Sequence, residues 1–207
     1  MDIDNIYRDT PEDKIPWNYD TPPESLVELV KNQKVKPCTA IDLGCGIGNY
    51  SIYLANEGFS MTGIDISDLA ISIARRKARE QKVECRFLVK DLLGELEDFN
   101  EKFEFAFDWE LLHHIFPEER KKFVENVYKL LNPGGKYLSV SFSEKDPSFG
   151  GIGKYRETPL GTLLHFSSKL EMKELFEPFF KIIELKTIEI RGKPKPHIAN
   201  YVFMEKK

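Results

Sequence analysis

Two spacings of apolar residues alternate along this 207-residue chain. Short apolar runs that stop at Gly or Asp are typical of buried strands, and apolar residues three and four apart are typical of helices that cover them. The pattern predicts strands at 39–43, 60–65, 84–89, 103–108 and 136–142, and helices at 24–33, 50–57, 68–81 and 118–131. Regular alternation of strands and helices predicts a parallel sheet with helices on both faces.

The C-terminal part of the chain departs from this alternation. Segments 181–191 and 198–205 are both strand-like and are joined by Gly-Lys-Pro-Lys-Pro-His. That link is too short for a helical crossover, so the two strands should pair as an antiparallel hairpin. The expected fold class is therefore α/β: a Rossmann-like, doubly wound, mostly parallel sheet of seven strands with an antiparallel C-terminal edge hairpin.

The length favours one domain with additions, and two segments stand apart by composition. Residues 1–24 combine several prolines with Trp17 and Tyr19, which predicts an N-terminal arm that lies over the active site. Residues 143–165 are rich in Gly and Pro, and long loops of this kind in compact domains are more often functional than idle. We expect a single domain over 25–207 that carries a lid-like insertion at 143–165.

Charge and composition exclude several classes of protein. The 30 Lys and Arg residues and 34 Asp and Glu residues leave a net charge of −4, which argues against a nucleic-acid or anionic-membrane partner. No apolar run approaches the roughly 18 residues of a transmembrane helix, and the polar N-terminus is unlike a signal peptide. Three cysteines without a CxxC spacing fit reduced thiols. We expect a cytoplasmic protein, monomeric by default, without a metal site.

The most informative stretch is the glycine loop that follows the first strand. Gly44, Gly46 and Gly48 alternate after Asp42 and before a helix, so the backbone can turn sharply and approach a ligand. The dinucleotide fingerprint would require a third glycine at the position of Asn49. An acid close to the first glycine also disfavours a pyrophosphate. The loop therefore favours a ligand that carries positive charge over NAD.

Two further acids end the next two strands. Asp65 could accept hydrogen bonds from both hydroxyls of a ribose. Asp91 could accept the exocyclic amine of an adenine, with Leu92 against the ring. Any one acid at a strand end could instead cap the following helix. Three acids at three successive strand ends are harder to explain in that way and indicate a nucleoside.

Five motifs carry a family resemblance: DLGCGIGNY (42–50), GID (63–65), KDL (90–92), DWELLHHI (108–115) and LLNPGGKYLSV (130–140). In their order and spacing, over roughly residues 37–142, the chain resembles the class I S-adenosylmethionine-dependent methyltransferases. The resemblance implies S-adenosyl-L-methionine as cofactor. It implies a cofactor site made of Asp42, Gly44, Cys45, Gly46, Gly48, Asn49, Asp65, Ile66, Asp91, Leu92, Trp109 and Glu110.

Within that site, the resemblance assigns each group a part of the cofactor. Asp42 and the glycine loop would hold the methionine moiety, Asp65 the ribose and Asp91 the adenine, while Trp109 and Glu110 would line the methyl end. A weaker resemblance joins Pro16-Trp17 to the N-terminal Pro-Trp element of thiol, thiopurine, halide and tellurite-resistance methyltransferases. It implies a small acceptor such as a thiol, a metalloid or another soft nucleophile, which needs little deprotonation.

A base and a substrate pocket can also be predicted. If 110–115 is helical, Leu111, Leu112 and Ile115 are buried and Glu110 faces the cleft with His113, the candidate base. Both histidines could instead lie on the helix surface or support the site from behind. The expected substrate-binding residues are Trp17, Tyr19, Phe142, Tyr155 and Arg156, where Arg156 would select an anionic substrate. The 143–165 segment could alternatively cap the sheet edge.

Three functions remain open at this point. The first is in-line methyl transfer to a small molecule, which the arm and the insertion favour because both could close a pocket. The second is methylation of a protein or nucleic acid, which usually needs an added domain or a basic surface. The third is a non-catalytic protein of the same fold, which would bind the cofactor without turnover.

Overall fold

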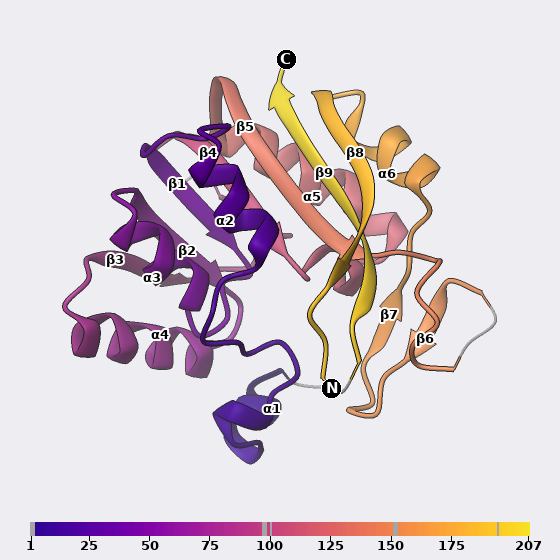
Figure 1. Cartoon of the computed structure of the whole chain (residues 1–207), viewed down its shortest axis with the longest axis horizontal. Coiled ribbons are helices and arrows are strands. Elements are labelled where there is room, and N and C mark those ends of the chain that lie inside the picture. The colour runs from indigo at the N-terminus through magenta and orange to yellow at the C-terminus, as the bar shows by residue number, and fades with distance from the viewer. Residues whose placement is uncertain (1–2, 97–98, 100, 151–152, 194) are drawn as a thin grey trace.

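A computed structural model describes residues 3–96, 99, 101–150, 153–193 and 195–207. Its centre is a seven-stranded sheet of order β3–β2–β1–β4–β5–β9–β8 (Figure 1). The strands are β1 (Thr39–Leu43), β2 (Ser60–Asp65), β3 (Cys85–Val89), β4 (Phe103–Trp109), β5 (Leu131–Phe142), β8 (Phe180–Ile190) and β9 (His197–Lys206). The first five strands are parallel, and β9 runs antiparallel to both of its neighbours. The predicted fold class is confirmed.

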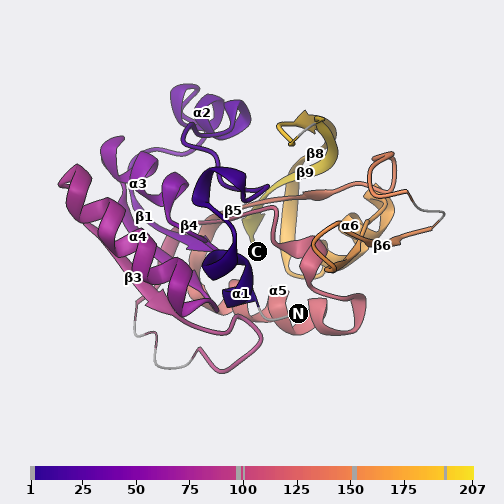
Figure 2. The ribbon, with the colours of Figure 1, turned by 90° about the horizontal axis from the view of Figure 1, so that it is seen from below.

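Helices cover both faces of the sheet. On one face lie α2 (Glu24–Lys31), α3 (Asn49–Asn56) and α4 (Asp68–Gln81), and on the other lie α5 (Pro117–Leu130) and α6 (Lys169–Phe176) (Figure 2). Neighbouring residues of β4 point to opposite cores: Phe105 and Phe107 pack with α2, and Ala106 packs with α5. The sequence did not predict α6, although Ser168 and Glu171 form a capping box at its start.

The N-terminal arm folds back over the carboxyl ends of the central strands. It contains α1 (Ile3–Asp9), which ends before the first proline, and the short 3-10 helix η1 (Glu12–Lys14). Ile6, Tyr7 and Ile15 of the arm are buried against Ile47 and Ala70. The link between β8 and β9 holds the arm from the other side, because Lys193 Nζ donates to the carbonyls of Asp13, Ile15 and Asn18 at 2.9, 3.1 and 2.9 Å.

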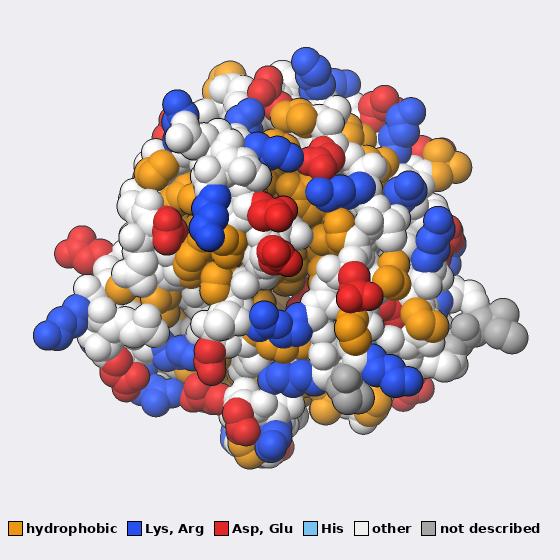
Figure 3. All heavy atoms as spheres, viewed as in Figure 1, with side chains coloured by type: hydrophobic (Ala, Val, Ile, Leu, Met, Phe, Trp, Pro, Cys, Tyr) orange, Lys and Arg blue, Asp and Glu red, His pale blue; other side chains and the backbone are white. Residues whose placement is uncertain are grey.

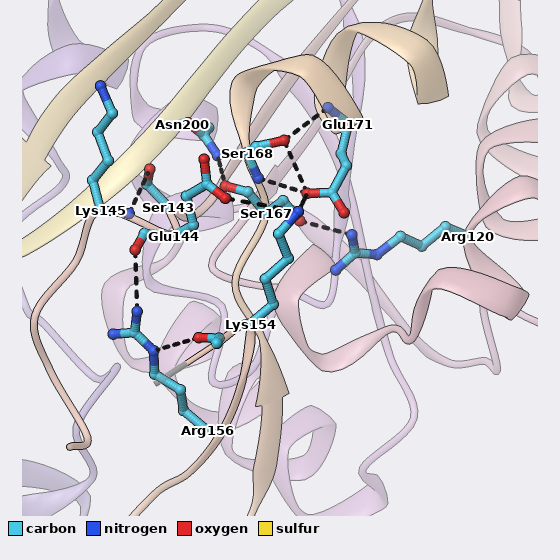
Figure 4. A network of polar contacts seen from close by, with 11 residues as sticks. Arg120, Ser143, Glu144, Lys145, Lys154, Arg156, Ser167, Ser168, Glu171 and Asn200 are labelled. Atoms are coloured by element: carbon cyan, nitrogen blue, oxygen red, sulfur yellow. Dashed lines mark hydrogen bonds and ion pairs between the residues drawn. The ribbon is translucent and has the colours of Figure 1, made fainter. Parts of the chain in front are cut away.

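The insertion contains a small antiparallel pair of strands, β6 (Tyr155–Glu157) and β7 (Leu163–His165), outside the main sheet (Figure 1). Its loops are braced by buried cations (Figure 4). The Arg156 guanidinium donates to the carbonyls of Glu144, Asp146, Ser148 and Gly153. Arg120 of α5 donates to Ser167 Oγ at 2.7 Å and to the His165 carbonyl at 3.2 Å. The insertion is therefore fixed to the domain by defined hydrogen bonds.

The surface shown in Figure 3 carries Lys and Arg side chains interspersed with Asp and Glu, so this face has no broad area of one charge sign. Within the described part of the chain, no helix is both long and apolar enough to cross a bilayer.

Candidate functional site

The glycine loop between β1 and α3 has a backbone that only glycine adopts easily. Gly44, Gly46 and Gly48 all have positive φ, at +73°, +51° and +78°. Gly48 also has no room for a side chain, because an added Cβ would lie 2.7 Å from Phe87 Cζ and 2.9 Å from Ala74 Cβ. The loop is thus seated directly on β3 and α4, and its free edge lines a cavity.

This first cavity brings together most of the predicted cofactor residues. It is lined by Asp42, Gly44, Cys45, Gly46, Asn49, Asp65, Ile66, Trp109 and Glu110 from the predicted set. Three of these are carboxylic acids, and no Lys or Arg is among its described lining residues. The cavity therefore suits a ligand with positive charge and disfavours a pyrophosphate.

Asp42 and Asp65 are both buried beside the loop. Asp42 accepts a hydrogen bond from Ser51 Oγ at 2.7 Å, and burial raises the pKa of this carboxyl to about 7. The two oxygens of Asp65 accept the backbone N–H groups of Gly46, at 2.8 Å, and Ser67, at 2.9 Å. Asp65 therefore ties the glycine loop to the end of β2 while it lines the cavity, and its pKa is also raised by burial.

Asp91 and Leu92 are not among the described residues that line this cavity, and their contact with the adenine stays a prediction. Asp91 is exposed and accepts the N–H of Leu93 at 2.8 Å, so its carboxylate stabilises a local turn. Leu92 is buried in the core under α5. The apolar surface beside Asp65 comes instead from Ile66, which is 60% exposed, and Val89, which is 40% exposed.

The arm supplies the wall opposite the glycine loop. Trp17 and Tyr19, which were predicted to bind substrate, line the first cavity, and so does Tyr7, which the sequence did not single out. The Trp17 indole donates to Tyr7 Oη at 2.9 Å, and Asn49 Nδ2 donates to the Tyr19 carbonyl at 2.8 Å. The only signal that could have found Tyr7 is the aromatic content of the arm.

At the end of β4, Glu110 has a positive φ of +64°, which is uncommon for a residue with a side chain. Its N–H donates to the Val140 carbonyl at 2.8 Å. Asp108 supports the turn by accepting from Tyr137 Oη at 2.6 Å and from the N–H of Leu112 at 3.4 Å. Burial raises the pKa of Glu110 to about 8. No hydrogen bond or ion pair of its carboxylate is found within the described part of the chain.

The helix expected through 110–115 is not formed, because the positive φ at Glu110 interrupts it. Only a 3-10 turn, η2 (Leu112–His114), remains. His113 is buried and stacked on Phe142, with ring centres 4.1 Å apart, and its Nδ1 accepts the N–H of Phe142 at 3.3 Å. A neutral ring in this position carries its proton on Nε2, so it offers the cavity a donor and not a lone pair. The geometry disfavours His113 as a base, and that role stays a prediction.

It is His114, and not His113, that reaches the first cavity. Its ring meets Trp17 edge-on, with centres 6.4 Å apart. His114 is exposed, and partial desolvation of its ring against the cavity walls lowers its pKa, so the ring is neutral at pH 7.

A second cavity adjoins the first. Trp17, Tyr19, Glu110 and His114 line both, and so form the junction between them. The second cavity is otherwise lined by Pro16, His113, Phe142, Phe149, Thr158, Pro159, Leu160, Thr162, Leu164, Gly192, Lys193 and His197. Its walls are mostly aromatic and aliphatic, which fits a small ring-shaped molecule.

Tyr155 and Arg156 lie elsewhere, which corrects two predictions. Tyr155 is 51% exposed and packs against Phe116 and His165. Arg156 is buried and its guanidinium is occupied by backbone carbonyls, so it cannot select an anionic substrate. The insertion reaches the cavity through Phe149 and the turn at 158–162.

The β8–β9 hairpin contributes residues that the sequence did not indicate. His197 lines the second cavity, with its Nδ1 3.3 Å from Asp146 Oδ2. Lys193 is the only Lys or Arg among the described lining residues, and its ammonium is taken by the arm carbonyls. Neither residue could be found from the sequence, because both act through contacts with segments far away along the chain.

Comparison with known proteins finds similarity to methyltransferases, the family that the sequence motifs resemble. Residues 40–135 match the family described as "Methyltransferase domain". The chain is 31% identical over 114 residues to the ubiquinone biosynthesis O-methyltransferase of Coxiella burnetii, covering 55% of this chain and 47% of that one. It is 26% identical over 130 residues to the 2-heptyl-1-hydroxyquinolin-4(1H)-one methyltransferase of Mycobacteroides abscessus, covering 62% and 56%. The chain thus spans about half the length of these relatives.

A solved structure has the same fold over nearly the whole chain. A protein from work on the conversion of a disulfide bond into a thioacetal group during echinomycin biosynthesis superimposes with a TM-score of 0.84. The match covers 99% of this chain and 91% of that one at 23% sequence identity, which shows the fold alone.

Proposed function

We propose that this chain is a class I S-adenosylmethionine-dependent methyltransferase that transfers a methyl group to a small planar molecule held in the second cavity. The observation that carries this proposal is the junction of two cavities at Trp17, Tyr19, Glu110 and His114. One cavity has the acids and the glycine loop for a cationic nucleoside, and the other has aromatic walls. A methyl group at the junction would face the acceptor directly.

The chemistry of the first cavity fits S-adenosyl-L-methionine. Asp42 and the glycine loop would hold the methionine end, and Asp65 the ribose. Ile66 and Val89 offer an apolar surface for the adenine. When bound, this cofactor supplies an activated methyl group on a positively charged sulfur. Three carboxyl groups and no described Lys or Arg favour that charge.

The protein's own contribution is to position the reactants and exclude water. In-line transfer needs the nucleophile about 3–3.5 Å from the methyl carbon. The arm covers the junction with Trp17 and Tyr19, and Lys193 holds it shut through three backbone carbonyls. Removal of water strengthens every charge interaction in the site.

The acceptor is proposed from the walls of the second cavity. The Phe142 ring stacks on His113 with centres 4.1 Å apart and meets His197 at a tilt with centres 4.5 Å apart, and Phe149 stacks on His197. Such a wall suits a flat aromatic or heteroaromatic ring. The relative that acts on 2-heptyl-1-hydroxyquinolin-4(1H)-one makes that compound a reasonable first probe.

The other predicted acceptors have less support. A metalloid acceptor would favour cysteine ligands. None of the three cysteines is among the described lining residues of the second cavity. Anionic acceptors lack a free cation there, since Lys193 is engaged by the arm. A protein or nucleic acid would have to enter past the arm, and a non-catalytic protein would not need the second cavity.

Thermal unfolding with S-adenosylhomocysteine, and with NAD as the parallel control, tests the cofactor. Ligand at about 100 times its Kd adds roughly 2.7 kcal/mol of stability. For a chain of this size we expect the Tm to rise by about 5–11 °C with the nucleoside and not with NAD. A rise with NAD alone would overturn the proposal.

A further inference from the structure

The junction between the two cavities holds two polar groups that the protein leaves unpartnered. The Glu110 carboxylate has no hydrogen bond or ion pair within the described part of the chain. Tyr19 Oη is buried and also lacks a hydrogen-bond partner among the described residues. Tyr19 and Glu110 line both cavities, and burial, and next the charge of Glu110, raise the pKa of Tyr19 to about 12. Buried polar groups are normally satisfied, so the open Tyr19 hydroxyl, in a junction that also holds the half-buried Glu110 carboxylate, points to a ligand that completes it.

Glu110 is also held in a backbone conformation that costs energy. A positive φ at a residue with a side chain costs about 1–2 kcal/mol and persists only where the surroundings impose it. Here the hydrogen bond to Val140 and the Asp108 turn impose it, and the result is a carboxylate that faces both cavities.

The other groups that could take a proton are poorer choices. His113 Nδ1 is already engaged by the Phe142 N–H. His114 reaches the junction, but its side chain is exposed and desolvation lowers its pKa, so it is a weaker base than Glu110. His197 lines only the second cavity and is not at the junction.

We propose that Glu110 is the catalytic base, which accepts the proton of a hydroxyl or ring N–H on the methyl acceptor, so that the acceptor enters as a neutral molecule. This inference rests on the proposed function. The acceptor oxygen or nitrogen forms the bond to the methyl carbon, the carbon–sulfur bond breaks with its electron pair remaining on sulfur, and the proton passes to a Glu110 oxygen. One positive and one negative charge disappear together, and no further reactant is needed.

The ionisation of Glu110 should therefore respond to the charge on sulfur. The ionisable groups that line the first cavity with it are Tyr7, Tyr19, Asp42, Cys45, Tyr50, Asp65 and His114, and Arg191 lies over the Tyr19 ring at 5.3 Å. With a pKa of about 8, Glu110 is mostly protonated in the empty site at pH 7. A positive sulfur nearby favours the carboxylate, whereas the neutral sulfur of S-adenosylhomocysteine does not.

Titration calorimetry of the full chain in buffers of different ionisation enthalpy measures this directly. At pH 7 we expect S-adenosylmethionine to release about half a proton more than S-adenosylhomocysteine on binding. Glu110→Gln should abolish that difference. Glu189→Gln, which removes the same kind of group from an exposed position, should retain it. The two ligands differ only by one methyl group and its charge. Protons that Asp42 or Asp65 release on contact with the nucleoside and methionine parts are common to both ligands, so they cancel in the difference.

The outcomes are separable. If neither ligand binds, the proposed function fails and this inference falls with it. If both bind but release equal numbers of protons, or if Glu110→Gln keeps the difference, the inference alone is overturned. With 2-heptyl-1-hydroxyquinolin-4(1H)-one as acceptor, Glu110→Gln should also lower kcat at least 100-fold at pH 7 while the Kd for S-adenosylhomocysteine changes less than threefold.

Discussion

Replacing Gly48 by Ala tests whether glycine is required at this position for its backbone conformation alone or also for its close packing. The new Cβ would lie 2.7 Å from Phe87 Cζ and 2.9 Å from Ala74 Cβ, at a φ of +78°. Gly134→Ala is a matched control, because Gly134 has nearly the same φ of +72° and nothing within 4 Å of an added Cβ. Both variants bear the conformational cost, of about 1–2 kcal/mol. Only Gly48→Ala adds overpacking, of about 1–3 kcal/mol.

The difference between the two variants is therefore the measured quantity. Urea unfolding followed by circular dichroism should give Gly48→Ala a free energy of unfolding about 1–3 kcal/mol below that of Gly134→Ala. Its Tm should be lower by about 2–12 °C. Adding Phe87→Leu should recover part of the loss, because a smaller side chain gives the methyl group room. If the two single variants were equally stable to within about 0.5 kcal/mol, the close contact with Phe87 would not be the reason for glycine at this position.

Three further outcomes follow from contacts at the arm, the junction and α6. Lys193→Met removes the three hydrogen bonds by which Lys193 holds the arm, which we call the Lys193 clamp. S-adenosylhomocysteine should then dissociate about tenfold faster in stopped-flow measurements. The same dissociation rate in Lys193→Met and Lys195→Met would refute the role of the clamp. Because the folded-state pKa of Glu110 is raised from 4.5 to about 8, the folded state binds its proton more tightly than the unfolded state does. The free energy of unfolding of the wild type, from urea titrations at each pH, should fall as pH rises from about 5 to 8, and that of Glu110→Gln should fall less. An equal dependence on pH in the two proteins would contradict the raised pKa of Glu110. Ser168→Ala removes the capping box of α6 and should cost about 1 kcal/mol in the free energy of unfolding with nucleoside affinity unchanged, whereas an unaltered Tm would show that the cap contributes nothing.

The sequence predicted the parts of the fold that depend on local periodicity. The predicted 68–81 helix has the bounds of α4, and the hairpin at the C-terminal edge follows from a link too short for a crossover. The helix through 110–115 was wrong because its apolar spacing could not reveal a positive φ at Glu110. That backbone is imposed by the hydrogen bond to Val140 and by the Asp108 turn, which are tertiary contacts.

The candidate site divides along the same line. Asp42, Asp65 and the glycine loop follow directly from strand ends, so they could be placed from the sequence. Arg156 was assigned to the substrate because a lone cation in a loop looks free, whereas four backbone carbonyls occupy it. The sequence does not show which backbone carbonyls a loop will bury. It therefore cannot show which cation will bind them.

The contact between Lys193 and the arm also imposes an order on folding during synthesis. Lys193 lies 175 residues beyond Asn18, whose carbonyl it binds. At translation rates of about 5–20 residues per second, the arm exists for roughly 9–35 s before the lysine that closes it is made. Throughout that interval the parallel strands can assemble and the arm can pack against Ile47 and Ala70, but its hydrogen bonds to Lys193 are missing. The second cavity, which Lys193 and His197 line, is therefore completed only when one of the last segments synthesised reaches back to one of the first.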